Sequence, residues 1–292
     1  MLYNEDAERD VQAVGVVMKI VDFRIRFRTA FCLPEYIPST IPGYELYIDH
    51  YKMRDRISEI PVQEQIELML EAGIEKAVVC SPSLESNKII YELSKRFPGR
   101  LCCFATANAK HGICSACDEL KRAYEEYGFY GLSLGPYSTG LFMDDRRNYP
   151  LYAISESMGR IVNLHCSLHF NRKKSMKLGD PTRLDQIAMD FPEMNIVMAH
   201  AGNGFGDTPI SVAMRHPTIY LDYSALRPHI LGKNMLKAMN GFFQDRILWG
   251  SEYPLLSYDS WQEWEKYLKP EIMPKFLNAN AVKLLSSVED NR

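Results

Sequence analysis

The sequence has almost no excess of charge of either sign. Its 292 residues include 34 Lys and Arg against 37 Asp and Glu, so the formal net charge is −3 and the pI is near 6.2. A balance this close to neutrality provides neither the basic surface that binds nucleic acid nor the polybasic segment that binds anionic lipids. We therefore expect no nucleic acid and no membrane among its partners.

Long apolar runs are also absent. No uninterrupted apolar stretch approaches the roughly 20 residues that a transmembrane helix needs. The first residues, MLYNEDAERD, are acidic where a secretory signal would be basic. The seven cysteines are an odd number scattered along the chain, as is usual for reduced thiols, and Cys114 and Cys117 lack the second C-x-x-C of a zinc site. These features predict a cytoplasmic protein.

No glycine-rich phosphate loop follows the first expected strand, which disfavours an open dinucleotide-binding sheet. The sequence instead alternates apolar strands with amphipathic helices, which is typical of a parallel sheet covered by helices. We expect a single domain, residues 1–292, folded as an α/β (β/α)₈ TIM barrel, with a doubly wound sheet as the alternative. The expected strands are 17–27, 74–81, 101–108, 129–135, 159–167, 194–202, 218–224 and 245–254, and the expected helices are 61–73, 85–97, 113–128, 144–159, 181–192, 206–216, 229–242, 257–268 and 271–287.

Polar residues stand at the carboxyl ends of several expected strands, which is where a (β/α)₈ barrel carries its active site. In the first strand, VDFRIRF, alternation predicts one apolar face with Phe23, Ile25 and Phe27 and an opposite face with two arginines. The candidate site residues at the strand ends are Arg24, Arg26, His165, His200, Asp222 and Glu252, and Asn203 follows the sixth strand.

The segments GRIVNLHC, DFPEMNIVMAHAGN, YLDYS, DRILWGSEYP and FLNANAVKLL resemble the amidohydrolase-related ("amidohydrolase 2") family of TIM-barrel, metal-dependent hydrolases and decarboxylases. The resemblance extends from Val17 to Leu285. It implies a metal-dependent-hydrolase fold and cleavage of C–N, C–O or C–C bonds next to carboxyl or carbonyl groups. It also leaves room for a homo-oligomer, as in many relatives.

The resemblance implies a metal site that this sequence does not complete. Family members usually open with D-x-H-x-H, and those two histidines hold a divalent metal, commonly zinc, together with a strand-five histidine and a strand-eight aspartate. His165 matches the strand-five ligand, Glu252 takes the aspartate position, and Arg24 and Arg26 replace the two strand-one histidines. A guanidinium has no lone pair for a metal, and two of them repel a dication. We expect no metal cofactor. A divalent ion such as zinc, if present, would be held weakly by His165 and Glu252, and by His200 if its side chain turned toward the ion.

The same residues predict an anionic substrate. Arginine's planar fork suits bidentate pairing with a carboxylate, so Arg24 and Arg26 would bind a small carboxylate, with Asn203 and Asp222 beside it. His200 or His165 would act as general acid and base. Glu252 would orient a group or accept a proton. The function expected is hydrolysis or decarboxylation of a small anionic molecule.

Two alternatives remain open from the sequence. The arginines could form a structural ion cluster with Glu252 and Asp222, since buried arginines are usually paired, and the barrel would then be a catalytically degenerate ligand-binding or scaffold protein. The long segment 28–60 between the first strand and its helix could be a lid or binding loop, or an oligomer contact.

Overall fold

The computed structural model describes residues 19–29, 32 and 44–290. The start of the chain and parts of the expected first strand and of the segment 28–60 lie outside the described residues. Within that segment the structure has a short helix, α1 (Tyr44–His50), and a 3₁₀ turn at Arg54–Arg56.

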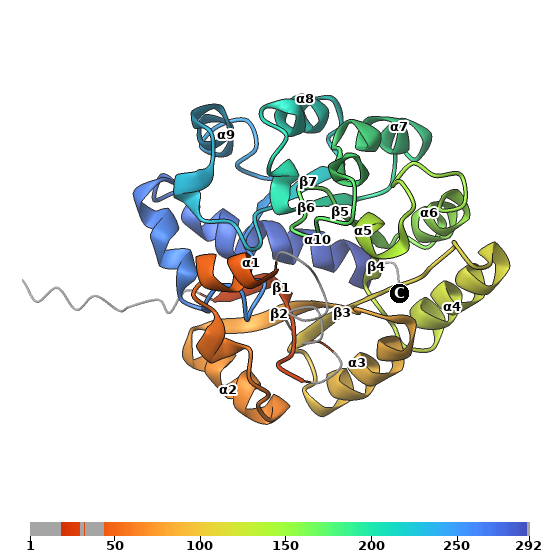
Figure 1. Cartoon of the computed structure of the whole chain (residues 1–292), viewed down its shortest axis with the longest axis horizontal. Helices are drawn as coiled ribbons and strands as arrows, with labels where there is room; N and C mark the ends of the chain where they lie inside the picture. Colours follow the sequence, from red (N-terminus) through yellow and green to blue (C-terminus); the bar gives the residue numbers. More distant parts are fainter. Residues whose placement is uncertain (1–18, 30–31, 33–43, 291–292) are drawn as a thin grey trace, which may run out of the picture.

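Eight parallel strands run in chain order around a barrel, which confirms the predicted fold (Figure 1). A parallel bridge between Ile25 and Tyr253, together with the hydrogen bond from the Phe23 amide to the Trp249 carbonyl, joins the eighth strand to the first. The strands are β1 (Ile20–Ile25), β2 (Ile74–Cys80), β3 (Leu101–Ala105), β4 (Gly131–Leu134), β5 (Ile161–His165), β6 (Ile196–Ala199), β7 (Ile219–Asp222) and β8 (Ile247–Leu248).

The helices surround the barrel, and most lie where amphipathic periodicity predicts them (Figure 1). They are α2 (Val62–Glu71), α3 (Leu84–Arg96), α4 (Ile113–Glu125), α6 (Tyr149–Ser157), α7 (Thr182–Asp190), α8 (Thr208–Arg215), α9 (Lys233–Met239) and α10 (Asn280–Glu289). The segment expected as a helix at 257–268 contains a 3₁₀ helix, Ser260–Lys266, and the expected last helix begins with a π turn at Lys275–Ala279. A short helix that the sequence did not predict, α5 (Pro136–Thr139), follows β4.

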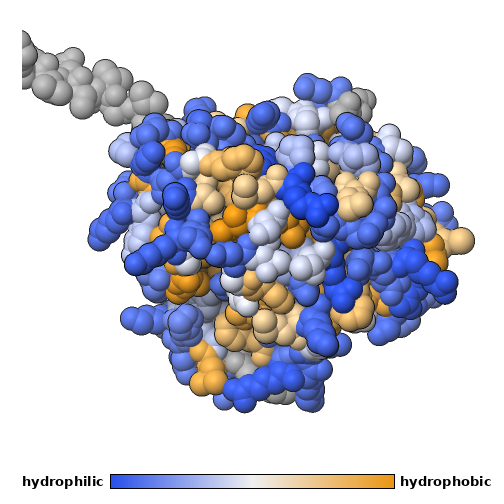
Figure 2. All heavy atoms as spheres, turned by 90° about the horizontal axis from the view of Figure 1, so that it is seen from above, coloured by the Kyte–Doolittle hydropathy of each residue, from blue (hydrophilic) through white to orange (hydrophobic). Residues whose placement is uncertain are grey.

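On the face shown in Figure 2, hydrophilic residues surround limited apolar patches. None of the helices in the described part of the chain is long and apolar enough to cross a membrane.

The first strand carries a β-bulge, so its apolar side chains do not share one face as expected. Asp22 pairs with Ala77 and Ile25 with Val79, so three steps along β1 oppose two along β2. Phe23 therefore packs inside the barrel, whereas Ile25 and Phe27 join the larger core between the sheet and the outer helices. The prediction that these three side chains share one face was wrong because simple alternation assumes a regular strand.

The bulge also decides where the two arginines point. Below it, Phe23 fills the barrel interior together with side chains of the opposite strands and of α10, which covers the amino ends of the strands. Above it, both Arg24 and Arg26 line a pocket at the carboxyl ends. The barrel thus has an apolar floor and a charged top.

Candidate active site

A pocket opens at the carboxyl ends of the strands and contains about 1090 Å³ of space, its open mouth included. Of the residues predicted at the strand ends, it brings together Arg24, Arg26, His165, His200, Asn203 and Glu252.

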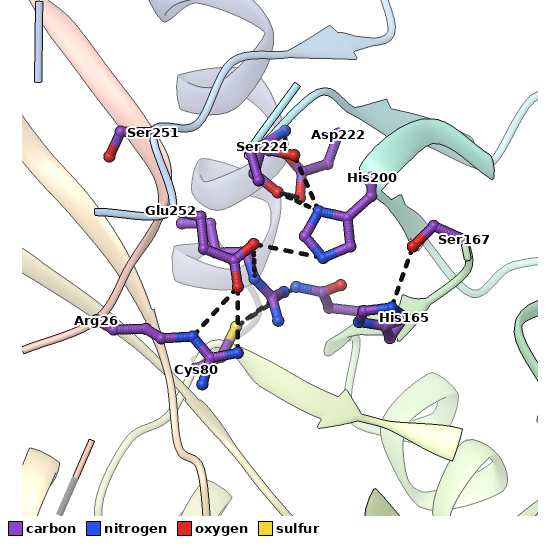
Figure 3. A network of polar contacts seen from close by, with 12 residues as sticks. Arg26, Cys80, His165, Ser167, His200, Asp222, Ser224, Ser251 and Glu252 are labelled. Atoms are coloured by element: carbon purple, nitrogen blue, oxygen red, sulfur yellow. Dashed lines mark hydrogen bonds and ion pairs between the residues drawn. The ribbon is translucent and has the colours of Figure 1, made fainter. Parts of the chain in front are cut away.

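The centre of the pocket is a buried ion cluster around Glu252 (Figure 3). Its Oε1 accepts hydrogen bonds from Nε and Nη2 of Arg26 at 3.2 and 3.1 Å. Its Oε2 lies 3.2 Å from Nε of Arg24 and 3.4 Å from Nε2 of His200. Glu252 thus shares one carboxylate between two guanidinium groups, and planar cationic groups of this kind favour an anion.

The surroundings of Glu252 make it a poor base. Burial alone would raise its pKa, but the guanidinium groups of Arg24 and Arg26, together with the neighbouring His200, outweigh burial and lower the pKa to about 2. The carboxylate therefore stays ionised near neutral pH. The contacts suit Glu252 to holding the two arginines in place and balancing their charge. A group with so low a pKa is poorly suited to accept a proton, which is the role predicted for it from the sequence.

His200 is a better candidate for the base. Its Nδ1 lies 2.9 Å from the carbonyl oxygen of Ser224, which can only accept, so Nδ1 carries the hydrogen and Nε2 the lone pair. Burial lowers the pKa of His200, and the attraction of Glu252 only partly offsets this. A neutral imidazole thus presents Nε2 toward the carboxylate of Glu252, which would stabilise the imidazolium after proton uptake.

Asp222 lies beneath the pocket and does not border it. Its carboxylate accepts hydrogen bonds from the Ser224 amide at 2.8 Å and from the Ser224 hydroxyl at 2.7 Å, and the side chain is fully buried. Burial raises its pKa to about 7. The residue that sequence reasoning placed beside the substrate therefore positions Ser224, which in turn orients His200.

His165 faces His200 edge-on, with ring centroids 4.7 Å apart. Nε2 of His165 lies 3.1 Å from the Ser167 hydroxyl, which is also 2.9 Å from the Leu168 carbonyl oxygen. Ser167 thus anchors the imidazole at the rim of the pocket. Burial and the charges nearby hold its pKa well below the usual range, so this imidazole is also neutral.

A second carboxylate joins β1 to the loop that carries Glu252. Asp22 accepts hydrogen bonds from the backbone amides of Arg24 and Ser251, and from the Ser251 hydroxyl in a short contact of 2.5 Å. Gly250 allows the close approach, since a Cβ there would lie 2.8 Å from Cβ of Ser224 and 3.1 Å from the Arg24 amide nitrogen. Asp22 was left outside the predicted site, although it begins the D-x-R-x-R pattern.

Backbone strain gathers at the same rim. The non-glycine residues His200, Ala201, Ala225 and Glu252 have φ of 61°, 46°, 59° and 49°, and they follow β6, β7 and β8. Such left-handed conformations cost free energy for residues with a Cβ and are most often kept at functional sites. The strain thus marks the predicted histidine and glutamate as parts of one built site.

The other side of the pocket is aromatic: Tyr47 and Tyr51 come from the segment 28–60, for which the sequence left a binding loop open, whereas the rest was not found from the sequence. Tyr137 stacks on His169 with ring centroids 4.6 Å apart, and Tyr47 of α1 contacts Phe170 at 4.3 Å. Cys80, at the end of β2, also lines the pocket. The only sequence signal for His169 was its spacing from His165, because contacts between separate loops leave no pattern in the chain.

Residues 67–286 match the family model described as amidohydrolase. The chain belongs to the amidohydrolase family. No curated protein matches it in sequence.

Solved structures of similar fold include an uncharacterised TIM-barrel protein from Bordetella bronchiseptica, 25% identical, with a TM-score of 0.78 over 93% of this chain and 100% of that one. The 2,6-dihydroxybenzoate decarboxylase from Rhizobium is 17% identical, with a TM-score of 0.66 over 92% and 99% of the two chains. The 5-carboxyvanillate decarboxylase from Novosphingobium aromaticivorans, complexed with manganese and 4-hydroxy-3-methoxy-5-nitrobenzoic acid, is 14% identical, with a TM-score of 0.69 over 92% and 96%. The latter two likenesses establish the fold.

The residues present do not fit the divalent metal of such relatives. In the described ranges, no three or more His, Cys, Asp or Glu side chains gather so that they could hold a metal ion. The carboxylate that would be a ligand, Glu252, is already bound by the Arg24 and Arg26 side chains. Guanidinium groups offer no lone pair and repel a dication at this distance.

Proposed function

We propose that this amidohydrolase-family protein is a metal-independent acid–base catalyst for a small carboxylate, of the decarboxylase or hydrolase type. The observation that carries the proposal is the pair of guanidinium groups, of Arg24 and Arg26, that share the Glu252 carboxylate beside the neutral imidazole of His200 in one pocket. The arginine pair supplies the fixed positive charge that binds the substrate's carboxylate.

His200 would do the proton transfer. Its Nε2 takes a proton from a water or a substrate hydroxyl, and the resulting imidazolium is stabilised by Glu252, 3.4 Å away. In hydrolysis that proton passes to the leaving group, and in decarboxylation it passes to the carbon that loses CO₂. The same residue therefore serves both reaction types. Structural neighbours named as decarboxylases of hydroxylated benzoates, and the aromatic wall at Tyr137 and Phe170, favour decarboxylation.

Binding of benzoate compared with benzamide, measured by calorimetry, tests the anion site. We expect benzoate to bind and its neutral amide to bind at least about tenfold more weakly, because a charge-assisted hydrogen bond contributes about 1.5–3 kcal/mol. Arg24→Gln should lose most of this preference. Arg54→Gln is the matched control, because Arg54 pairs with Asp49 on the exposed face of the α1 region. Equal binding of acid and amide by the wild type would refute the anion site.

Turnover is tested separately. Release of CO₂ from hydroxybenzoates and of acid from small esters and lactones distinguishes the two reaction types, and His200→Asn should reduce the rate about 10²–10⁴-fold. Asparagine can still donate to the Ser224 carbonyl, so the variant removes the base while keeping its anchor.

The second candidate function is ligand binding without turnover. It is favoured by the pairing of both arginines with Glu252, which is the structural ion cluster that the sequence left open. Tight benzoate binding with no product from either substrate panel would support it.

A further inference from the structure

Tyr51, which follows α1, carries a hydroxyl that none of the roles proposed above uses. The side chain is buried, borders the pocket, and donates a hydrogen bond to the Ala225 carbonyl at 3.0 Å. Burial, to which the negative charge of Glu252 adds, raises the pKa of Tyr51 to about 12, so the hydroxyl keeps its hydrogen at neutral pH. The bond joins the segment 28–60 to the loop after β7, 174 positions further along the chain.

Ala225 belongs to a tight turn that sets the direction of the Ser224 carbonyl. The Leu226 amide donates to the Tyr223 carbonyl at 3.2 Å, which places Ser224 and Ala225 at the two central positions of the turn. Ala225 has a φ of 59°, and a positive φ at this position is what a type II turn requires, usually of glycine. An alanine without support would relax to a type I turn, which differs by a flip of the central peptide.

The central peptide of this turn carries the carbonyl that anchors His200. The Ser224 carbonyl oxygen lies 2.9 Å from Nδ1 of His200, and Figure 3 shows the two residues side by side. A flip of the 224–225 peptide would turn this oxygen to the opposite side of the turn, and Nδ1 would lose its acceptor. The hydrogen would then no longer be fixed on Nδ1, and the lone pair of Nε2 would no longer be fixed beside Glu252.

The segment that carries Tyr51 is itself attached to the loops at the top of the barrel. Tyr51 and Ala225 belong to one buried apolar cluster, together with Leu255 of the loop after β8. The Arg56 side chain donates to the Tyr51 carbonyl at 3.1 Å. It also donates to the carbonyls of Pro254 and Leu255, at 3.0 and 2.9 Å. These contacts keep the Tyr51 hydroxyl within reach of the turn.

We propose that Tyr51 is a positioning residue for His200. Its hydrogen bond to the Ala225 carbonyl holds the 224–225 peptide in the orientation that directs the Ser224 carbonyl to Nδ1 of the imidazole. The inference rests on the proposed function, in which His200 is the base. It gives the segment 28–60 a part in assembling that base, besides bordering the pocket.

The substitution Tyr51→Phe removes the hydroxyl and keeps the ring. We expect turnover in the substrate panels above to fall about fivefold to tenfold, which is the effect of one lost hydrogen bond. Benzoate affinity in calorimetry should not change, because both arginines stay in place. Addition of Ala225→Gly should restore the rate, since glycine adopts a positive φ without strain. The matched control is Tyr149→Phe, whose hydroxyl donates to Asp190 on the exposed surface at 2.7 Å.

Nitrogen-15 NMR of the imidazole rings gives a readout that does not depend on turnover. The spectrum distinguishes a hydrogen on Nδ1 from one on Nε2, and the signals of His200 are identified by their loss in His200→Asn. We expect the hydrogen on Nδ1 in the wild type and in Tyr149→Phe, and a mixture of the two forms in Tyr51→Phe. Addition of Ala225→Gly should return the wild-type spectrum.

A wild-type His200 spectrum in Tyr51→Phe, or a change that Ala225→Gly does not reverse, would overturn the inference. Absence of turnover by the wild type would instead overturn the proposed function, and the NMR comparison would still decide the role of Tyr51. Should Tyr51→Phe not fold, Arg56→Gln replaces it, with Arg54→Gln as its control because Arg54 pairs with Asp49 at the exposed surface. Mixed signals in Arg56→Gln alone would support the inference, and equal spectra would overturn it.

Discussion

Replacement of Glu252 by Gln distinguishes a structural role of the ion cluster from a role in anion binding. The variant should be less stable than the wild type but should bind an anion more tightly. Glu252 is 4% exposed and touches Arg24, Arg26 and His200. Its replacement by an amide removes the carboxylate that the two guanidinium groups share, and breaking a buried ion pair in this way costs about 3–5 kcal/mol of folding free energy. The pKa gives a similar figure, since a shift from 4.5 to about 2 corresponds to about 3 kcal/mol.

The same substitution removes one negative charge from the cluster, so the variant should bind benzoate more tightly than the wild type. Saturating benzoate should then restore part of the lost stability, because a ligand that binds only the folded state stabilises it. Urea unfolding with and without benzoate, alongside calorimetry, gives both numbers. Weaker benzoate binding by a folded Glu252→Gln protein would refute the view that the arginines form the anion site.

The pH dependence of the free energy of unfolding tests the lowered pKa of Glu252. A carboxylate with a depressed pKa stabilises the folded state above its unfolded value and loses that contribution as the pH falls. The wild type should therefore lose about 3 kcal/mol between pH 4.5 and about 2 through Glu252 alone. Glu252→Gln should lack this part of the acid transition. An identical acid transition in both proteins would show that the carboxylate is not held by the arginines.

Three further predictions concern the surroundings of the cluster. Gly250→Ala should lower the free energy of unfolding by about 1–3 kcal/mol and weaken benzoate binding, because its Cβ would meet neighbouring atoms at 2.8 and 3.1 Å. The control Gly232→Ala, whose Cβ would have no atom within 4 Å, should leave urea unfolding nearly unchanged. Prolonged treatment with a chelator should leave benzoate binding by the wild type unchanged, and chelator-sensitive binding would contradict the metal-free site. The double variant Arg24→His/Arg26→His should gain an affinity for zinc that calorimetry can measure. Burial raises the pKa of Asp222 to about 7, so the free energy of unfolding should fall as the pH rises from about 4 to 7. Urea unfolding at pH 5 and pH 8 should show a smaller difference in Asp222→Asn than in the wild type.

The sequence by itself determined the barrel and the ring of polar residues at its top. Apolar strands that alternate with amphipathic helices can bury their faces in few ways, and parallel strands bring their carboxyl ends to one edge. His165, His200 and Glu252 could therefore be placed together from their positions at strand ends, and the same reasoning identified Arg24 and Arg26.

Only the tertiary structure decided what these residues do to one another. The bulge in β1, which directs both arginines into the pocket, is a local irregularity that alternation cannot predict. The tautomer of His200 depends on the Ser224 carbonyl 24 positions away, and the contact of Cys80 with Asn163 joins residues 83 positions apart. Hydrogen bonds and pKa shifts act over a few ångströms of space, so they follow from packing and not from order along the chain.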